Sequence, residues 1–327
     1  NVKMIGITKD GRWLSYDGPV GLIGSGEWQR LAEAGNKPRQ LLLSAGTAIM
    51  ESENESSGKI DVVFPVLHGL NGEDGTIQGL LEMAGIPYVG CGVLSSALCM
   101  DKAYAKIIFE KEGIPQGKYL VFSRKQVYRD TDSVIRQVEE ALTYPCFIKP
   151  SNAGSSVGVT KAHDSQELYD ALMLAARYDI RILAEEFING REAECAVLGN
   201  DEPQASVVGE VVPCNEFYDY QAKYSDESTS RIIIPAELPE ETVQKIRQYA
   251  VKAFKALDCA GLSRVDFFVH KETGEVYINE INTLPGFTNI SMYPKLWEAS
   301  GIPYGELIDR LINLAIEKFE DNKREIE

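Results

Sequence analysis

The sequence predicts an α/β and α+β protein of several domains. Its 327 residues are too many for one small core and suit two or three domains. Strand-like and helix-like segments alternate over residues 61–90, which is typical of a βαβ unit in a parallel sheet. Strand-like runs at 263–270 and 276–282 flank a glycine turn, which predicts an antiparallel hairpin.

Composition narrows the class of protein. Hydrophobic residues make up 44% and charged residues 25%, as in globular proteins. The net charge of −16 argues against nucleic acid or an anionic membrane as partner. No apolar run is long enough to span a bilayer, and residues 1–8 resemble a strand and not a signal peptide. Six scattered cysteines without a CxxC pair favour buried free thiols in a reducing cytoplasm.

The βαβ unit carries the first candidate site residues. Residues 61–67 and 86–90 predict strands, and residues 76–84 predict the helix between them. His68 and Glu73 lie in the loop after the first strand, where open α/β sheets bind ligands. Glycine and aspartate in this loop could equally serve only to shape a turn.

A second loop predicts an anion site. Residues 95–112 predict a helix that carries Lys102, and residues 144–150 predict a strand with Lys149 near its end. The following loop, 151–158, is rich in glycine and serine, whose N–H and hydroxyl groups can surround phosphate. It is not a Walker loop, because GxxxxGK[ST] is absent and a strand follows. Lys149 directs positive charge at the same place, which favours an anion.

Residues 180–198 suit a flat ring with polar edges. Glu185 ends a strand, Phe187 and Ile188 supply apolar surface, and Glu192 follows a turn. Adenosine would need this combination, although acidic linkers between domains look similar. Residues 215–230 form a long aromatic and polar stretch, which predicts a lid loop.

The hairpin predicts a cation site. Alternation puts Val276, Ile278, Glu280 and Asn282 on one face of the second strand, with successive side chains about 7 Å apart. Pairing brings Asp266 beside Glu280. Carboxylate and amide oxygens suit Mg²⁺ held together with substrate phosphates. Ordinary edge carboxylates are the alternative, and it is disfavoured because acids on apolar strands need a reason to be buried.

Four segments, residues 64–76, 147–158, 217–224 and 279–288, resemble the signatures of D-alanine–D-alanine ligases. This family belongs to the ATP-grasp superfamily and includes the vancomycin-resistance D-alanine–D-serine ligases. The resemblance implies an ATP-grasp fold with an N-terminal open parallel-sheet (pre-ATP-grasp) domain. It implies domains at 1–94, 95–184 and 185–327, the last with the metal site and the lid loop 215–230.

The resemblance also implies an activity. ATP would phosphorylate D-alanine, and a second D-amino acid would attack the D-alanyl phosphate to give D-alanyl-D-alanine for peptidoglycan. The enzyme would be a cytoplasmic homodimer that uses two Mg²⁺ ions, with Mn²⁺ as an alternative. A D-alanine–D-serine ligase is the runner-up, and a non-catalytic nucleotide-binding protein is a further alternative.

Roles follow for individual residues by the same resemblance. The metal ligands would be Asp266, Glu280 and Asn282. The nucleotide would meet Lys102, Lys149, Ser156, Glu185, Phe187, Ile188, Glu192 and Lys223. Catalysis would use Arg264, the Gly286 N–H and a Ser155–Tyr224 link that holds the lid. The amino-acid substrates would meet His68, Ser291 and Met292.

Two departures from the family pattern stand out. The family opens with a glycine-rich strand–helix unit whose glutamate binds the first substrate's amine. This unit is not found before Asn1, so the first domain is expected to be truncated. Tyr224 resembles the dipeptide ligases, and Met292 is apolar where lactate enzymes and some serine enzymes carry arginine. Both favour D-alanine, yet one hydroxyl separates it from D-serine.

Overall fold

The computed structural model describes residues 1–34, 41–44, 47–50, 60–154, 157–212, 231–288 and 290–324. They form two compact units, one of residues 1–63 with 80–87 and the other of residues 64–79 with 88–327. All predicted site residues belong to the second unit. The division into three domains inferred from the sequence stays a prediction. Over the described ranges, no helix has the length and apolarity to cross a membrane.

The first unit contains two short hairpins. In the first hairpin β1 (Met4–Ile7) pairs with β2 (Trp13–Tyr16), and α1 (Glu27–Ala34) packs on β2. In the second hairpin β3 (Leu41–Ser44) pairs with β4 (Thr47–Met50).

The predicted parallel strands 61–67 and 86–90 are wrong as elements. Both stretches are extended chain, linked by a hydrogen bond from Val63 N to Pro87 O of 2.8 Å. Pro65 and Pro87 carry no N–H group, so neither can donate to a ladder. The helix between them is confirmed as α2 (Thr76–Met83).

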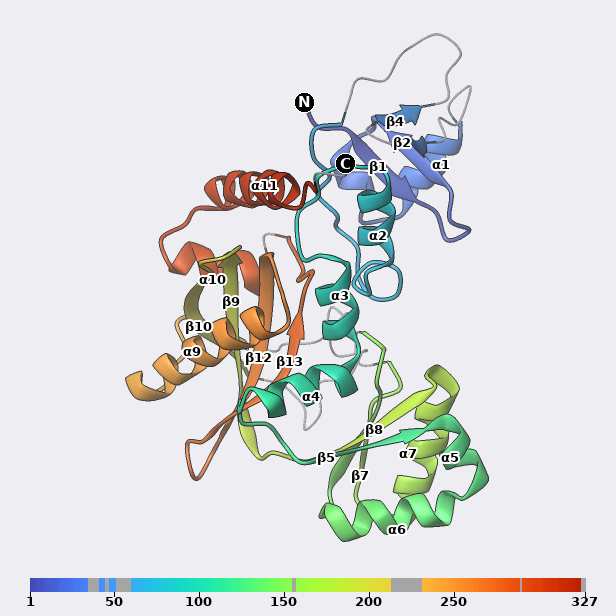
Figure 1. Cartoon of the computed structure of the whole chain (residues 1–327), viewed down its shortest axis with the longest axis vertical. Helices are drawn as coiled ribbons and strands as arrows, with labels where there is room; N and C mark the ends of the chain where they lie inside the picture. Colours follow the sequence, from blue (N-terminus) through green and yellow to red (C-terminus); the bar gives the residue numbers. More distant parts are fainter. Residues whose placement is uncertain are drawn as a thin grey trace. The chain divides into compact units, whose positions relative to one another are not determined.

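The middle of the sequence forms an antiparallel sheet in the order β5-β8-β6-β7, drawn in green with helices α5, α6 and α7 in Figure 1. Its strands are β5 (Tyr119–Ser123), β6 (Cys146–Pro150), β7 (Thr160–Ala162) and β8 (Arg181–Glu186). Apolar side chains of these strands form one core with those of α5 (Arg124–Arg129), α6 (Thr131–Ala141) and α7 (Ser165–Tyr178). The predicted strand 144–150 is confirmed as β6, and the strand predicted to end at Glu185 is confirmed as β8.

The predicted helix 95–112 is instead two helices, α3 (Val93–Met100) and α4 (Lys102–Lys111). Asp101 separates them with an extended backbone, φ −87° and ψ 98°, and its carboxylate accepts a hydrogen bond from Ala103 N. A buried aspartate that caps the second helix therefore divides the predicted helix in two. Lys102 thus begins a helix instead of lying inside one.

A five-stranded antiparallel sheet in the order β11-β10-β9-β12-β13 forms the C-terminal part. Its strands are β9 (Gly190–Gly199), β10 (Gln204–Val212), β11 (Arg231–Ile233), β12 (Gly261–His270) and β13 (Val276–Asn282). The accompanying helices are α9 (Glu240–Ala256), α10 (Met292–Ala299) and α11 (Tyr304–Asp321).

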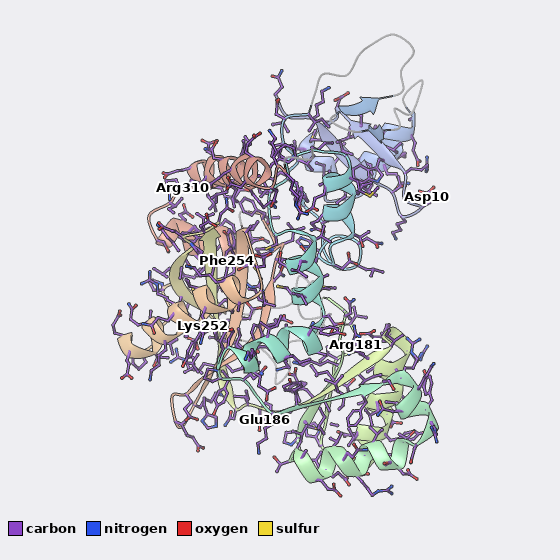
Figure 2. The ribbon with its side chains drawn as sticks, viewed as in Figure 1. Asp10, Arg181, Glu186, Lys252, Phe254 and Arg310 are labelled. Atoms are coloured by element: carbon purple, nitrogen blue, oxygen red, sulfur yellow. The ribbon has the colours of Figure 1, made fainter. Side chains whose placement is uncertain are left out.

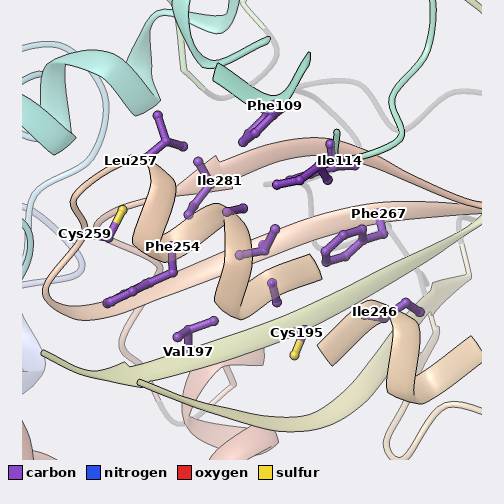
Figure 3. Packing of buried hydrophobic residues seen from close by; sticks show 14 of the residues in the cluster. Phe109, Ile114, Cys195, Val197, Ile246, Phe254, Leu257, Cys259, Phe267 and Ile281 are labelled. Carbon is purple, nitrogen blue, oxygen red and sulfur yellow. The ribbon is translucent and has the colours of Figure 1, made fainter. Parts of the chain in front are cut away.

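The main core lies between this sheet and α9, and Figure 3 shows its packing. Phe254 of α9 and Phe267 of β12 are fully buried there together with Phe109 of α4. The core therefore fixes α4 to the strands of the predicted metal site. Five cysteines are free and buried, as expected, namely Cys91, Cys99, Cys146, Cys195 and Cys259. Cys214 lies outside the described residues.

The β12–β13 hairpin is confirmed, but it contains a bulge. Asp266 pairs with Glu280 whereas Phe267 pairs with Ile278, so Asn279 is left over. Val276, Ile278 and Ile281 consequently all enter the core, and Glu280 and Asn282 take the opposite face. The expectation that Val276 and Ile278 share a face with the two polar residues is therefore wrong.

Candidate functional site

The three predicted metal ligands come together on one face of the hairpin. Asp266 lies directly opposite Glu280, and Asn282 follows two positions along β13, opposite Arg264. Side chains of directly paired residues have Cβ atoms about 5 Å apart. The hairpin therefore concentrates two carboxylates and one amide away from the hydrophobic core.

This oxygen set fits a divalent cation that shares its ligands with a phosphate. Lys102 Nζ lies 3.4 Å from Glu280 Oε2, and Asn282 Oδ1 accepts a 2.9 Å hydrogen bond from Leu284 N. Among the residues that the structure describes, no group of three or more His, Cys, Asp and Glu side chains could hold a metal alone. An ion here would need Asn282 and oxygens of a bound phosphate as further ligands.

Arg264 lies between two carboxylates. Its Nε and one terminal nitrogen each donate to Asp266 at 2.7 Å, and Nε lies 3.0 Å from Glu194 Oε2. Burial alone would lower the pKa of the guanidinium, but Asp266 and Glu194 raise it well above its usual value. Arg264 is therefore a permanent, well-oriented cation beside Asp266.

A buried cluster surrounds Glu185 in the central sheet. Lys149 Nζ donates to Glu185 Oε2 at 2.6 Å, and Lys106 Nζ lies 3.3 Å from Oε1. Burial opposes ionisation of Glu185, but the two ammonium groups outweigh it and lower its pKa to about 2. Burial lowers the pKa of Lys106, which the charge of Glu185 offsets only in part.

The root of the glycine/serine loop is tied to α4. Lys102 N donates to Ser151 O at 2.9 Å, and Lys102 Nζ donates to Ala153 O at 3.0 Å. Ser151 Oγ donates to buried Asp101 at 2.5 Å, and Arg181, labelled in Figure 2, donates to the same carboxylate. Lys102 is thus fixed where the predicted phosphate loop begins. Ser155 and Ser156 lie outside the described residues.

An apolar surface adjoins Glu185. Phe187 is 38% exposed, and its ring centroid lies 6.2 Å from that of Phe147, which pairs with Glu185 in the sheet. Ile188 approaches Gly117, whose added Cβ would lie 3.2 Å from the isoleucine side chain. Glu192 follows on β9 and is half-buried. A flat apolar group could lie on Phe187 with polar edges toward Glu185.

The loop that contains His68 and Glu73 lies close to the charges of Lys102 and Glu280. Burial raises the pKa of Glu73, and repulsion from Glu280 adds to this, whereas the Gly69 N–H, His68 and Lys102 lower it. A Cβ added at Gly154 would lie 3.4 Å from Gly69 Cα, so the two loops are in close contact. Exposed His68 therefore lies at the edge of the cluster that contains Lys102 and Glu280.

The loop after β13 contains Gly286 and Ser291. A Cβ on Gly286 would come within 2.9 Å of Ser291 Oγ, so this close approach requires glycine or a shift of the serine. Met292 is 7% exposed, and its sulfur would lie 3.1 Å from a Cβ added to Gly209. Gly209 pairs with Glu194, which puts Met292 on the face that carries Arg264.

The structure thus brings the three predicted metal ligands together with Lys102 and Arg264, and it brings Lys149 together with Glu185. The roles of the other predicted site residues stay a prediction, and Lys223 and Tyr224 lie outside the described residues. Sequence reasoning named Glu73 together with His68, but it missed Lys106 and Glu194 as site residues. Lys106 follows Lys102 by one helical turn and so shares its face, which was an available signal. The pairing of Glu194 with Asp266 depends on the β9–β12 register, which no local pattern shows.

Known proteins share this architecture. The family described as "D-ala D-ala ligase N-terminus" matches residues 1–91, and "D-ala D-ala ligase C-terminus" matches residues 108–313. The D-alanine--D-alanine ligase of Ruminiclostridium cellulolyticum is 67% identical, over 99% of this chain and 89% of its own. That of Acetivibrio thermocellus is 66% identical with the same coverage.

Solved structures of ligases are also similar to this chain. The VanG D-Ala:D-Ser ligase from Enterococcus faecalis superposes with a TM-score of 0.85 at 40% identity, covering 96% of this chain and 90% of that one. The D-alanine-D-alanine ligase from Coxiella burnetii gives 0.82 at 38% identity, covering 98% and 86%. The four-stranded and five-stranded sheets of this chain agree with these matches. The matches show that the chain belongs to the D-alanine–D-alanine ligase family, with the ATP-grasp fold.

Proposed function

We propose that this chain is a cytoplasmic, ATP-dependent ligase that joins two D-alanine molecules to D-alanyl-D-alanine for peptidoglycan. The observation that carries the proposal is the pairing of Asp266 with Glu280 beside Lys102 and Arg264. Oxygen ligands next to fixed cations suit the transfer of a phosphoryl group. Family membership and the 66–67% identical D-alanine--D-alanine ligases support the same activity.

The reaction balances in two steps. A carboxylate oxygen of the first D-alanine attacks the γ-phosphorus of ATP, and ADP leaves. The amine of the second D-alanine then attacks the acyl carbon, the amide bond forms, phosphate leaves, and the amine loses a proton. Two Mg²⁺ ions, replaceable by Mn²⁺, would neutralise phosphate charge from ligands on Asp266, Glu280 and Asn282.

Side chains and backbone groups of the chain would bind the substrates and stabilise the reacting groups. Lys102 and Lys149 would hold phosphate oxygens, with Lys223 and Ser156 expected beside them. Glu185, Phe187, Ile188 and Glu192 would hold the adenosine. Arg264 and the Gly286 N–H would stabilise the oxyanion that forms during attack by the amine. His68, Ser291 and Met292 would orient the amino acids, and the Ser155–Tyr224 link would close the lid against water.

D-Serine is the second candidate for the incoming amino acid. The 40% identical VanG enzyme is named as a D-Ala:D-Ser ligase, so this fold accommodates that product. Buried Met292 has no polar group that would reward the serine hydroxyl, which favours D-alanine.

The experiment measures phosphate release from ATP with D-alanine alone, with D-alanine plus D-serine, and with D-alanine plus D-lactate, and identifies products by mass spectrometry. We expect D-alanyl-D-alanine as the main product in all three mixtures. A main product containing serine would assign the chain to the D-serine enzymes. Absence of phosphate release with every D-amino acid would refute the ligase proposal. Light scattering would test the expected homodimer.

A further inference from the structure

We propose that Lys106 is a positioning residue that keeps Glu185 ionised and aimed at the nucleotide when Lys149 turns to the phosphates. This inference rests on the proposed function, and it gives Lys106 a role that needs no direct contact with ATP. Two lysines hold one carboxylate here, one on each oxygen. A single lysine would be enough to balance the charge of this buried glutamate.

The two lysines differ in exposure and in their position in the fold. Lys106 is 3% exposed and projects from α4, whereas Lys149 is 12% exposed and lies near the end of β6, next to the glycine/serine loop. Lys149 can therefore exchange its partner for a bound anion more readily than Lys106 can. When Lys149 does so, Glu185 would lose its closest cation, the one at 2.6 Å.

A buried carboxylate without a cation would take up a proton or turn away. Among the described residues, the titratable groups that face Glu185 are Lys149 on β6, Lys106 on α4 and Tyr119, its sheet partner on β5, whose ring Lys106 overlies. Within this described set, Lys106 is the residue that can supply the second positive charge. Lys106 therefore provides the charge that lets Lys149 leave Glu185 without neutralising it.

The second carboxylate oxygen supports a role toward a ligand. Glu185 Oε1 is buried and accepts no hydrogen bond from any described residue, although Lys106 lies 3.3 Å away. An acceptor in this state can take a donor such as an exocyclic amine of a base. Lys106 sets the orientation of this oxygen from a rigid element, because Gln116 Nε2 bonds Lys106 O at 2.8 Å and Phe109 anchors α4 in the core.

The test uses Lys106→Met in the full chain, with binding of a non-hydrolysable ATP analogue and Mg²⁺ measured by calorimetry from pH 8 to pH 6. We expect Kd to rise at least 10-fold at pH 8 and the ratio to wild type to grow further toward pH 6. The wild-type affinity should change far less over this range. Lys111→Met, on the same helix but exposed, is the matched control and should bind within twofold of wild type.

The pH dependence separates positioning from mere structural support. If Kd of the variant stays within twofold of wild type, or rises by a ratio independent of pH, the inference is wrong. Lys106→Gln replaces the methionine variant if thermal unfolding shows that the latter does not fold, and the same two criteria apply. Because the analogue is not consumed, this result is independent of which amino acids are ligated. A failed ligase assay with intact binding would contradict only the proposed function.

Discussion

Arg264 is the residue whose geometry is most demanding. It donates two 2.7 Å hydrogen bonds to Asp266 and approaches Glu194, which only a planar fork can do. Arg264→Lys keeps the charge but loses the paired contact, so we expect kcat to fall about 100-fold. Steady-state kinetics would check this. Arg310→Lys removes the fork of an exposed arginine paired with Glu306 and should leave kcat unchanged.

Glu185 predicts a specific dependence of stability on pH. Its pKa of about 2 lies below the ordinary value of 4.5, so the unfolded chain binds a proton first as the pH falls. Its contribution is therefore complete above about pH 5 and is lost toward pH 2. We expect Glu185→Gln to lower the free energy of unfolding by about 3 kcal/mol at pH 7.

Urea unfolding at pH 7, 5 and 4 would test this expectation. The difference between wild type and Glu185→Gln should shrink as the pH falls below 5. A difference that is constant or grows with acidity would mean that the lysines do not hold this carboxylate ionised.

The sequence predicted those site residues whose partners lie nearby in the chain. Asp266, Glu280 and Asn282 were predicted from polar residues on apolar strands, and the hairpin brings them together. Lys106 and Glu194 were missed because their partners lie on other elements, at Glu185 and Arg264. No local pattern reveals an ion pair between residues 79 positions apart or across a sheet register.

The bulge at Asn279 is the decisive feature among the elements. It switches the alternation of β13, so that Ile281 enters the core while Glu280 and Asn282 face the site. Deleting Asn279 would restore regular pairing with the same faces, because Ile278, Glu280, Ile281 and Asn282 would then alternate between core and site. We therefore expect the deletion variant to unfold cooperatively, with a Tm within about 5 °C of wild type. Loss of cooperative thermal unfolding would contradict this assignment of faces.

Ser151 connects α4 to the loop after β6. Its hydroxyl donates to Asp101 and accepts from Ala103 N at 3.0 Å. Ser151→Ala removes both hydrogen bonds, but Ala103 N still donates to Asp101 and Arg181 still pairs with it. We expect a loss of about 1 kcal/mol in stability and a higher KM for ATP because Lys102 is displaced. Ser133→Ala, at a half-buried position in the first turn of α6, serves as the control and should change neither quantity appreciably.

Helices and strands were predictable where period and capping agree. The predicted helix 76–84 is α2, Thr76–Met83, and the predicted strand 144–150 is β6, Cys146–Pro150, so both lie within two residues of expectation. The break at Asp101 was missed because apolar periodicity continues through it and only the buried cap interrupts the helix. The face assignment of β13 failed because a bulge depends on its partner strand, β12, and not on β13 alone.

The whole second unit depends on a core shared by the site elements. Phe109 of α4 is 0% exposed and packs in the cluster formed with α9, β12 and β13. Phe109→Ala should therefore cost about 3–5 kcal/mol of stability and also weaken ATP binding, because α4 carries Lys102 and Lys106. Ile107→Ala on the same helix, at a site 52% exposed, should cost less than 1 kcal/mol or so.

Denaturant unfolding and nucleotide titration would test both variants. If Phe109→Ala lost stability but bound nucleotide as wild type does, the core would stabilise the unit without positioning the site.

The sequence established the family and the order of elements but not the sheet topology. The orders β5-β8-β6-β7 and β11-β10-β9-β12-β13 join strands far apart in the chain, and local patterns carry no information on such pairing. The hairpin β12–β13 was predictable because its two strands are adjacent in sequence and a glycine turn joins them.

The most direct test of the central claim follows oxygen from substrate to phosphate. D-Alanine labelled with ¹⁸O in its carboxylate is incubated with ATP, Mg²⁺ and the enzyme, and the released phosphate is analysed by mass spectrometry. Attack of the carboxylate on the γ-phosphorus predicts one ¹⁸O atom in each phosphate formed with D-alanyl-D-alanine. Dipeptide formation with unlabelled phosphate would contradict the account.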